Sequence, residues 1–135
     1  MNVNTGTVTI TVDASGNGTD YIDLTGVGSG GKILSIHYTV TGTPYLEPSS
    51  PTNGFDFTIT TETTLQNLWV ETGITGAKSV APRQSVSDLV GSATFYNDGG
   101  DEPVVDYVFA SNERVKIVVA NAGNATSGTF RVIWG

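Results

Sequence analysis

Apolar and polar residues alternate over most of the chain, and this pattern predicts β-strands. Successive side chains of a strand point to opposite faces of a sheet, so every second residue lines the same face. One face of each predicted strand is therefore apolar and is expected to be buried. Nine segments carry the pattern, the one at 89–96 only weakly, and we predict seven or eight strands in all. The segments that carry it span residues 7–12, 20–24, 33–40, 55–60, 65–70, 89–96, 104–109, 114–120 and 129–134.

The alternation also predicts which side chains face the core. The last two strands, 114–120 and 129–134, are separated by a Gly/Asn/Ser turn, and we expect them to form a terminal hairpin with two buried faces. The segment 33–40 is the best candidate for a central strand. The residues expected to point inward are Val8, Ile10, Val12, Leu34, Ile36, Tyr38, Val40, Phe55, Phe57, Ile59, Val115, Ile117, Val119, Phe130, Val132 and Trp134.

Two long connections interrupt the strand pattern. Three prolines in the segment 44–51 remove amide donors, so this segment is expected to be an exposed loop. Residues 71–88 lack periodicity, and we expect them to form an excursion that contacts a partner, because such connections are often functional. No segment carries a helical apolar stripe longer than about two turns.

Composition agrees with an all-β protein. The chain has 135 residues, 17 glycines and only 14% charged residues, which is unlike a helical protein. Short strands separated by turns indicate a sandwich, a jelly roll or a small barrel. Among these we expect a single antiparallel β-sandwich domain spanning residues 1–135, with jelly-roll-like connections.

Charge and cysteine content exclude several classes of function. With no cysteine, the chain has no disulfide, thiolate metal site or cysteine nucleophile. A formal net charge of −7 opposes binding to the phosphates of nucleic acid. No run of eighteen apolar residues and no basic, apolar leader is visible, so we expect a soluble protein without a membrane partner or export signal.

Two groups of oxygen-bearing side chains are candidate calcium sites. Asp13, Ser15 and Asn17 match the opening of an EF-hand loop, but Leu24 occupies the position of the closing carboxylate, which favours an ordinary turn. A second, acidic cluster is expected to be solvated loop charge, with calcium or a basic partner as the alternatives. Its members are Asp98, Asp101, Glu102 and Asp106. We predict neither a metal nor a cofactor.

The single histidine, His37, lies between Ser35 and Thr39 on the polar side of its strand, and no catalytic triad is recognisable around it. No pair of carboxylates stands out as a glycosidase site. We therefore predict a protein that is not an enzyme. The aromatic residues suggest sugar stacking as one alternative, but most occupy strand patterns and are expected to pack in the core or at an interface.

Five residues are predicted to contact a partner. Tyr45 lies in the proline-rich loop and Arg83 in the excursion, where loops reach outward, and both types are favoured anchors at interfaces. Arg114, Lys116 and Arg131 carry half of all basic charges and project from the polar face of the predicted hairpin. They are expected either to contact an acidic surface of a neighbouring copy or to protect the sheet from aggregation with other molecules.

Several segments share a set of packing and turn patterns rather than a binding motif. These segments are Thr7–Gly16, Gly54–Thr63, Leu68–Gly73, Ala81–Arg83, Asn112–Gly123 and Gly128–Gly135. In these patterns the chain resembles small β-rich virion proteins of tailed bacteriophages, some of which are capsid decoration or cement proteins.

This resemblance implies a structural protein of the virion that decorates the capsid surface and is made in the host cytoplasm. The implied partners are the major capsid protein and sister copies, because a position on a local threefold axis invites a homotrimer. A tail or head-fibre component and a carbohydrate-binding β-sandwich module are the alternatives.

Overall fold

The fold is given by a computed structural model that describes residues 3–24, 31–40, 54–85, 90–91, 104–110 and 112–135. These residues contain ten β-strands and no helix, which confirms the all-β prediction. There are more strands than predicted because β6 and β7 have only three residues each, too few to show an alternation. The strands are β1 (Asn4–Thr11), β2 (Gly18–Asp23), β3 (Ile33–Val40), β4 (Phe55–Thr61), β5 (Asn67–Ile74), β6 (Lys78–Val80), β7 (Arg83–Ser85), β8 (Val105–Tyr107), β9 (Arg114–Ala120) and β10 (Ser127–Trp134).

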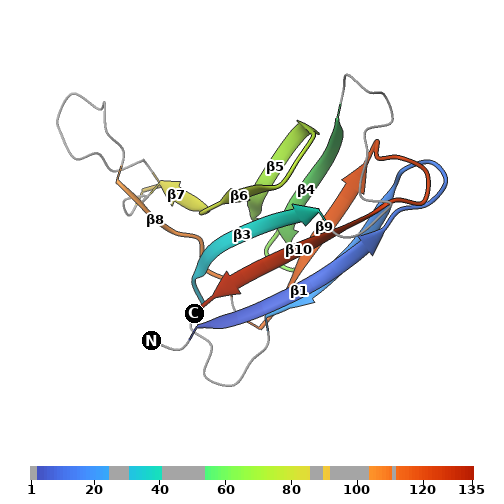
Figure 1. Ribbon diagram of the computed structural model, residues 1–135. Helices are drawn as coiled ribbons and strands as arrows, with labels where there is room; N and C mark the ends of the chain where they lie inside the picture. The colour runs from blue at the N-terminus through green and yellow to red at the C-terminus, as the bar shows by residue number, and fades with distance from the viewer. Residues whose placement is uncertain (1–2, 25–30, 41–53, 86–89, 92–103, 111) are drawn as a thin grey trace.

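Eight of these strands form two four-stranded antiparallel sheets that pack face to face (Figure 1). One sheet has the strand order β1-β10-β3-β6 and is called the β10 sheet below; the other has the order β2-β9-β4-β5 and is called the β9 sheet. Strands β7 and β8 pair separately as a two-stranded ribbon. The predicted antiparallel β-sandwich is thus confirmed.

The pairings are nested around the connection between β4 and β5. Strand β4 pairs with β5, β3 with β6, β2 with β9 and β1 with β10, in every case antiparallel. The chain therefore folds as one long antiparallel strand pair, whose successive parts belong alternately to the two sheets. Two further pairings, of β10 with β3 and of β4 with β9, join these parts into sheets.

The predicted terminal hairpin is wrong, because β9 and β10 belong to different sheets. The connection from Asn121 to Thr126 crosses the end of the sandwich, and Asn121 and Ala125 take positive φ there. It lies against the connection between β1 and β2, where the amide of Ala122 donates to the carbonyl of Gly16. Gly16 is required at this contact, since it has φ +80° and a Cβ would lie 2.0 Å from the Ala122 oxygen.

The two apolar faces of β9 and β10 nevertheless meet, across the sandwich rather than side by side. Val115, Ile117 and Val119 have no exposed surface, and Phe130 and Val132 have none either. The rings of Phe57 in the β9 sheet and Phe130 in the β10 sheet pack edge to face, with centroids 5.5 Å apart. The buried residues form one hydrophobic core.

The inward-facing residues whose burial is described, all those predicted except Val40, follow the predicted alternation except at a bulge in β3. Ile36 and Tyr38 are buried as expected, but Leu34 is only half-buried and Ile33 is fully buried in its place. The register between β10 and β3 shifts between Ile133 and Trp134, so β3 contains one extra residue there. The β3 residues before this bulge therefore point to the opposite face from the one that the alternation predicts. The alternation of β4 holds throughout, with Phe55, Phe57 and Ile59 buried.

The predicted excursion over residues 71–88 is wrong for its first fifteen residues. Strand β5 continues to Ile74, and the short strands β6 and β7 follow at 78–80 and 83–85. The period of two is lost here because the end of β5, β6 and β7 belong to three different sheets. Of the other predicted elements, the loop over 44–51 and most of the strand at 89–96 lie outside the described residues.

The β7–β8 ribbon lies beside the sandwich at one of its ends (Figure 1). Residues 104–109, predicted as a full strand, contain only the three residues of β8. The ribbon is tied to the β10 sheet by an isolated bridge between Lys32 and Phe109 and by the hydrogen bond from the amide of Ile33 to the carbonyl of Val108.

Candidate functional site

The outer side of the β10 sheet carries a surface that is rich in hydroxyl groups, called the hydroxyl face below. Every second residue of its four strands points outward, away from the core. The cross-strand register aligns Thr7 of β1, Arg131 of β10, His37 of β3 and Ser79 of β6 in one row. The face consists of Thr5, Thr7, Thr9, Thr11, Ser35, His37, Thr39, Ser79, Ser127, Thr129, Arg131 and Ile133.

Cross-strand hydrogen bonds order part of this face. The hydroxyls of Thr9 and Thr129 lie 3.0 Å apart, and those of Thr11 and Ser127 lie 2.8 Å apart. Both pairs join β1 to β10 at positions that are directly opposite in the register. Such pairs stabilise a sheet and restrict the side-chain rotamers, so the surface is preorganised.

His37 is held between two serines. Its Nε2 atom lies 2.9 Å from the Ser35 hydroxyl and its Nδ1 atom lies 2.7 Å from the Ser79 hydroxyl. In the described part of the chain no carboxylate hydrogen-bonds to the ring, so the third member of a catalytic triad is missing there. The backbone amides beside it belong to an interior strand of the sheet and are used in the ladder, which leaves no oxyanion hole. The arrangement positions the imidazole as a polar surface group.

An open hollow of about 430 Å³ lies over the centre of the hydroxyl face. Arg131 and His37 are its charged or titratable members, and Ile133 provides an apolar part of the wall. Arg131 is exposed, and within the described residues it forms neither an ion pair nor a cation–π contact. The lining residues are Thr7, His37, Thr39, Thr129, Arg131 and Ile133.

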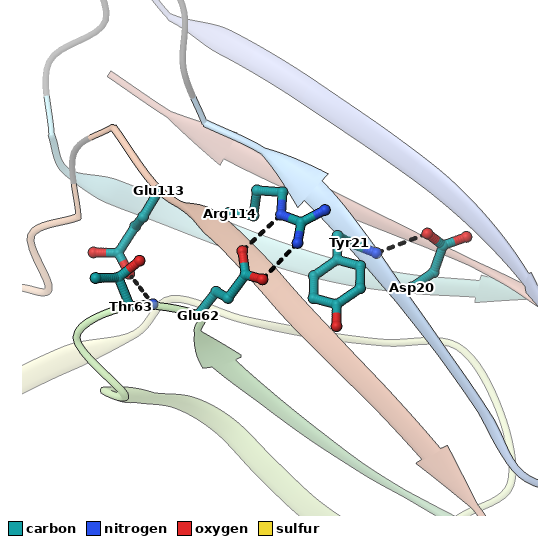
Figure 2. Close-up of polar contacts among 6 residues, drawn as sticks. All are labelled: Asp20, Tyr21, Glu62, Thr63, Glu113 and Arg114. Atoms are coloured by element: carbon teal, nitrogen blue, oxygen red, sulfur yellow. Dashed lines mark hydrogen bonds and ion pairs between the residues drawn. The ribbon is translucent and has the colours of Figure 1, made fainter.

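The outer side of the β9 sheet has a different character, because its arginine, Arg114, is paired. Figure 2 shows the Arg114 guanidinium donating two hydrogen bonds to the Glu62 carboxylate. The same guanidinium lies 4.0 Å from the centroid of the Tyr21 ring. The hydrogen bonds from Arg114 lower the pKa of Glu62 below its ordinary value. This cluster is internally satisfied and offers less to a ligand than an unpaired arginine does.

The structure separates three of the predicted contact residues. Arg114 and Lys116 point outward from the β9 sheet, whereas Arg131 points outward from the β10 sheet on the opposite side of the sandwich. The prediction of one shared polar face is therefore wrong. It depended on the terminal hairpin, and residues of two strands share a face only if the strands share a sheet.

Of the other two predicted contact residues, one lies on the ribbon. Arg83, in β7, places its guanidinium 4.0 Å from the centroid of the Tyr107 ring in β8 and also donates to the carbonyl of Pro82. The Lys32 ammonium is 5.5 Å from the centroid of the same ring. Tyr45 lies outside the described residues.

The two oxygen clusters have separate outcomes. The Asp13 carboxylate accepts hydrogen bonds from the amides of Ser15 and Asn17, which is the ordinary turn that the sequence favours over a calcium loop. In the acidic cluster only Asp106 is described, and its carboxylate accepts from the amide of Tyr107. No group of three or more metal-ligating His, Cys, Asp or Glu side chains occurs in the described parts of the chain.

Most aromatic residues in the described part of the chain fill the core, as expected. Trp69, Trp134 and Tyr38 are buried. No aromatic ring other than that of His37 lies on the hydroxyl face. A stacking platform for sugars is therefore missing from this face.

The sequence alone does not predict four residues of the hollow as site residues: Thr7, Thr39, Thr129 and Ile133. Their outward direction is predictable, because each alternates with buried residues along its strand. Only the register, which places β1, β10 and β3 side by side, brings them to Arg131.

No helix in the described residues is long and apolar enough to cross a membrane. No protein-family model matches the sequence, and neither a curated protein nor a solved structure matches it significantly.

Proposed function

We propose that the protein is a non-enzymatic structural component of a tailed-phage virion, a capsid decoration protein that binds the outer head shell and stabilises it. The nested strand pairing also leads us to infer a jelly-roll topology. Jelly rolls occur in viral capsid domains and in lectin domains, so the fold is compatible with this role without selecting it. The resemblance to small phage virion proteins selects the role within that range.

The observation that carries the proposal is the β7–β8 ribbon. It lies outside both sheets, and two large apolar side chains, Val105 in β8 and Phe109 two residues after β8, each have 48% of their surface accessible. Arg83 stacks on Tyr107 beside them. Arginine and aromatic residues are typical anchors of protein interfaces, and an apolar group next to them adds buried area.

In this proposal the ribbon binds the major capsid protein, and the protein acts at the capsid surface. A cement protein that binds only the assembled shell stabilises that state by mass action. A homotrimer is the proposed oligomer because it matches the local threefold axes of a shell. Arg83 and Tyr45 are its proposed contact residues, with Arg114 and Lys116 on the β9 sheet available to a sister copy.

The test is co-sedimentation of the purified protein with undecorated phage heads, with its mass in solution measured in parallel. Saturable binding by a trimer is the expected result. A defined oligomer that does not bind heads would contradict the proposal in favour of a tail or head-fibre component.

A matched pair of variants tests the ribbon itself. Val105→Ser should weaken head binding at least tenfold, because it removes apolar area from the proposed contact. Val70→Ser is the control, since Val70 is similarly exposed at 54% but lies on the outer side of the β9 sheet. Equal effects of the two variants would show that the ribbon is not the contact.

A further inference from the structure

The hollow on the hydroxyl face has the features of a site for a small polar ligand. Its volume of about 430 Å³ falls within the range of roughly 300–1,000 Å³ that is typical of small-molecule pockets. That volume is larger than a single acidic side chain needs. Its lining combines hydroxyls, one guanidinium and one imidazole with the apolar surface of Ile133.

Charge determines which ligand fits. The chain carries a net charge of −7, yet the hydroxyl face contains no carboxylate and has Arg131 near its centre. Arg131 lies in the row between Thr7 and His37, and no acidic partner neutralises it within the described residues. An exposed arginine surrounded by hydroxyls favours a carboxylate, which it can bind through two parallel hydrogen bonds.

We propose that this hollow binds an acidic saccharide, with the carboxylate of a uronic acid unit on Arg131. The hydroxyls of Thr7, Thr39 and Thr129 bond to the sugar hydroxyls, and Ile133 contacts the apolar face of the ring. His37 remains bonded to Ser35 and Ser79 and forms part of the wall. Specificity for acidic sugars follows because only a carboxylate forms paired hydrogen bonds with the Arg131 guanidinium.

The same observations favour two alternative ligands less. A neutral saccharide would leave the guanidinium without its best partner. An acidic peptide supplies carboxylates but does not use the hydroxyl rows of β1, β10 and β3. The inference does not depend on the decoration role, because it concerns the β10 sheet and not the ribbon.

The experiment is isothermal titration calorimetry of the full chain at 0.15 M salt, where long-range attraction is screened beyond about 8 Å. The probes are trigalacturonate, its carboxyl-reduced neutral counterpart and a triglutamate peptide. Trigalacturonate should bind at least tenfold more tightly than either of the other two. Absence of binding at millimolar trigalacturonate, or equal binding of the neutral sugar or the peptide, would overturn the proposal.

Two variants with the same change of charge locate the site. Arg131→Gln should weaken trigalacturonate binding at least tenfold, while Lys116→Gln, on the opposite side of the sandwich, should change it less than twofold. Thr7→Val tests the hydroxyl contribution and should weaken binding several-fold. Thermal unfolding establishes that each variant is folded, which is expected because these side chains lie on the outer faces. Equal weakening by Arg131→Gln and Lys116→Gln would mean nonspecific attraction and would also overturn the proposal.

Discussion

Glu113 holds Thr64 by two hydrogen bonds, one from the backbone amide of Thr64 to Oε1 (3.1 Å) and one from its hydroxyl to Oε2 (3.0 Å). Oε1 also accepts from the amide of Thr63 at 2.9 Å, as Figure 2 shows. Only 6% of Glu113 is exposed. Glu113 directly precedes β9, and the two threonines lie between β4 and β5. One carboxylate therefore fixes the β4–β5 turn, around which the strand pairings are nested.

Glu113→Gln should lower the free energy of unfolding by about 1–3 kcal/mol, because the amide nitrogen cannot accept the hydrogen bonds that one carboxylate oxygen accepts. Urea denaturation measures the loss. Glu62→Gln is the control: Glu62 directly follows β4, in the same connection as the two threonines, but its ion pair with Arg114 is on the surface. The control should have a much smaller effect, and a smaller loss for Glu113→Gln than for Glu62→Gln would refute the anchoring role.

Trp134→Ala should cost about 3–5 kcal/mol of unfolding free energy, as expected for removal of a large core side chain. Trp134 is only 6% exposed and packs over Gly6. Val70→Ala, at a position that is 54% exposed, should change stability by no more than about 0.5 kcal/mol. Chemical denaturation of both variants compares them. A cost below about 1 kcal/mol for Trp134→Ala would mean that the end of β10 does not complete the core.

Gly6→Ala should destabilise the protein by about 1–3 kcal/mol through overpacking. A Cβ at Gly6 would lie 2.4 Å from Cγ2 of Ile22 and 3.1 Å from the Trp134 ring, and the branched Ile22 side chain cannot easily move away. At Gly76 a Cβ would have no heavy atom within 4 Å. Gly76→Ala should therefore be close to neutral, and thermal unfolding of the two alanine variants should differ clearly. Equal melting temperatures would show that β1 and β2 can separate without cost.

The ion pair between Glu71 and Lys78 should make stability depend on pH in the acid range. Its hydrogen bond from Lys78 lowers the pKa of Glu71 from the ordinary value of 4.5. A lowered pKa in the folded state means that the contribution is complete above about pH 4.5 and is lost as the pH falls through the folded-state pKa.

The measurement is thermal unfolding of the wild type and of Glu71→Gln between neutral and acid pH. The wild type should be slightly more stable near pH 7, by about 1 kcal/mol or less for an exposed ion pair. This difference should shrink as the pH falls below 4.5. A difference that grows on acidification would contradict the assigned direction.

The pattern of residues was enough to predict the strands and most of the core. Every inward position of β4 and β9 that the alternation predicts is buried. The prediction failed at Leu34, where a bulge adds one residue, and over 71–85, where the end of β5 is followed by two strands of three residues that are too short to show a period. Bulges and short strands depend on how neighbouring strands fit together, and a local pattern does not contain that information.

The sequence by itself determined which side of each strand is buried, because side-chain direction along a strand is a local property of the backbone. Only the tertiary structure decided which strands are neighbours. Arg114 and Arg131 have the same outward direction in the sequence pattern, yet they lie on opposite sides of the sandwich because β9 and β10 joined different sheets. The grouping of Arg131 with Thr7 and His37 was likewise decided by pairing between segments far apart in the chain, since strand pairing is set by contacts through space.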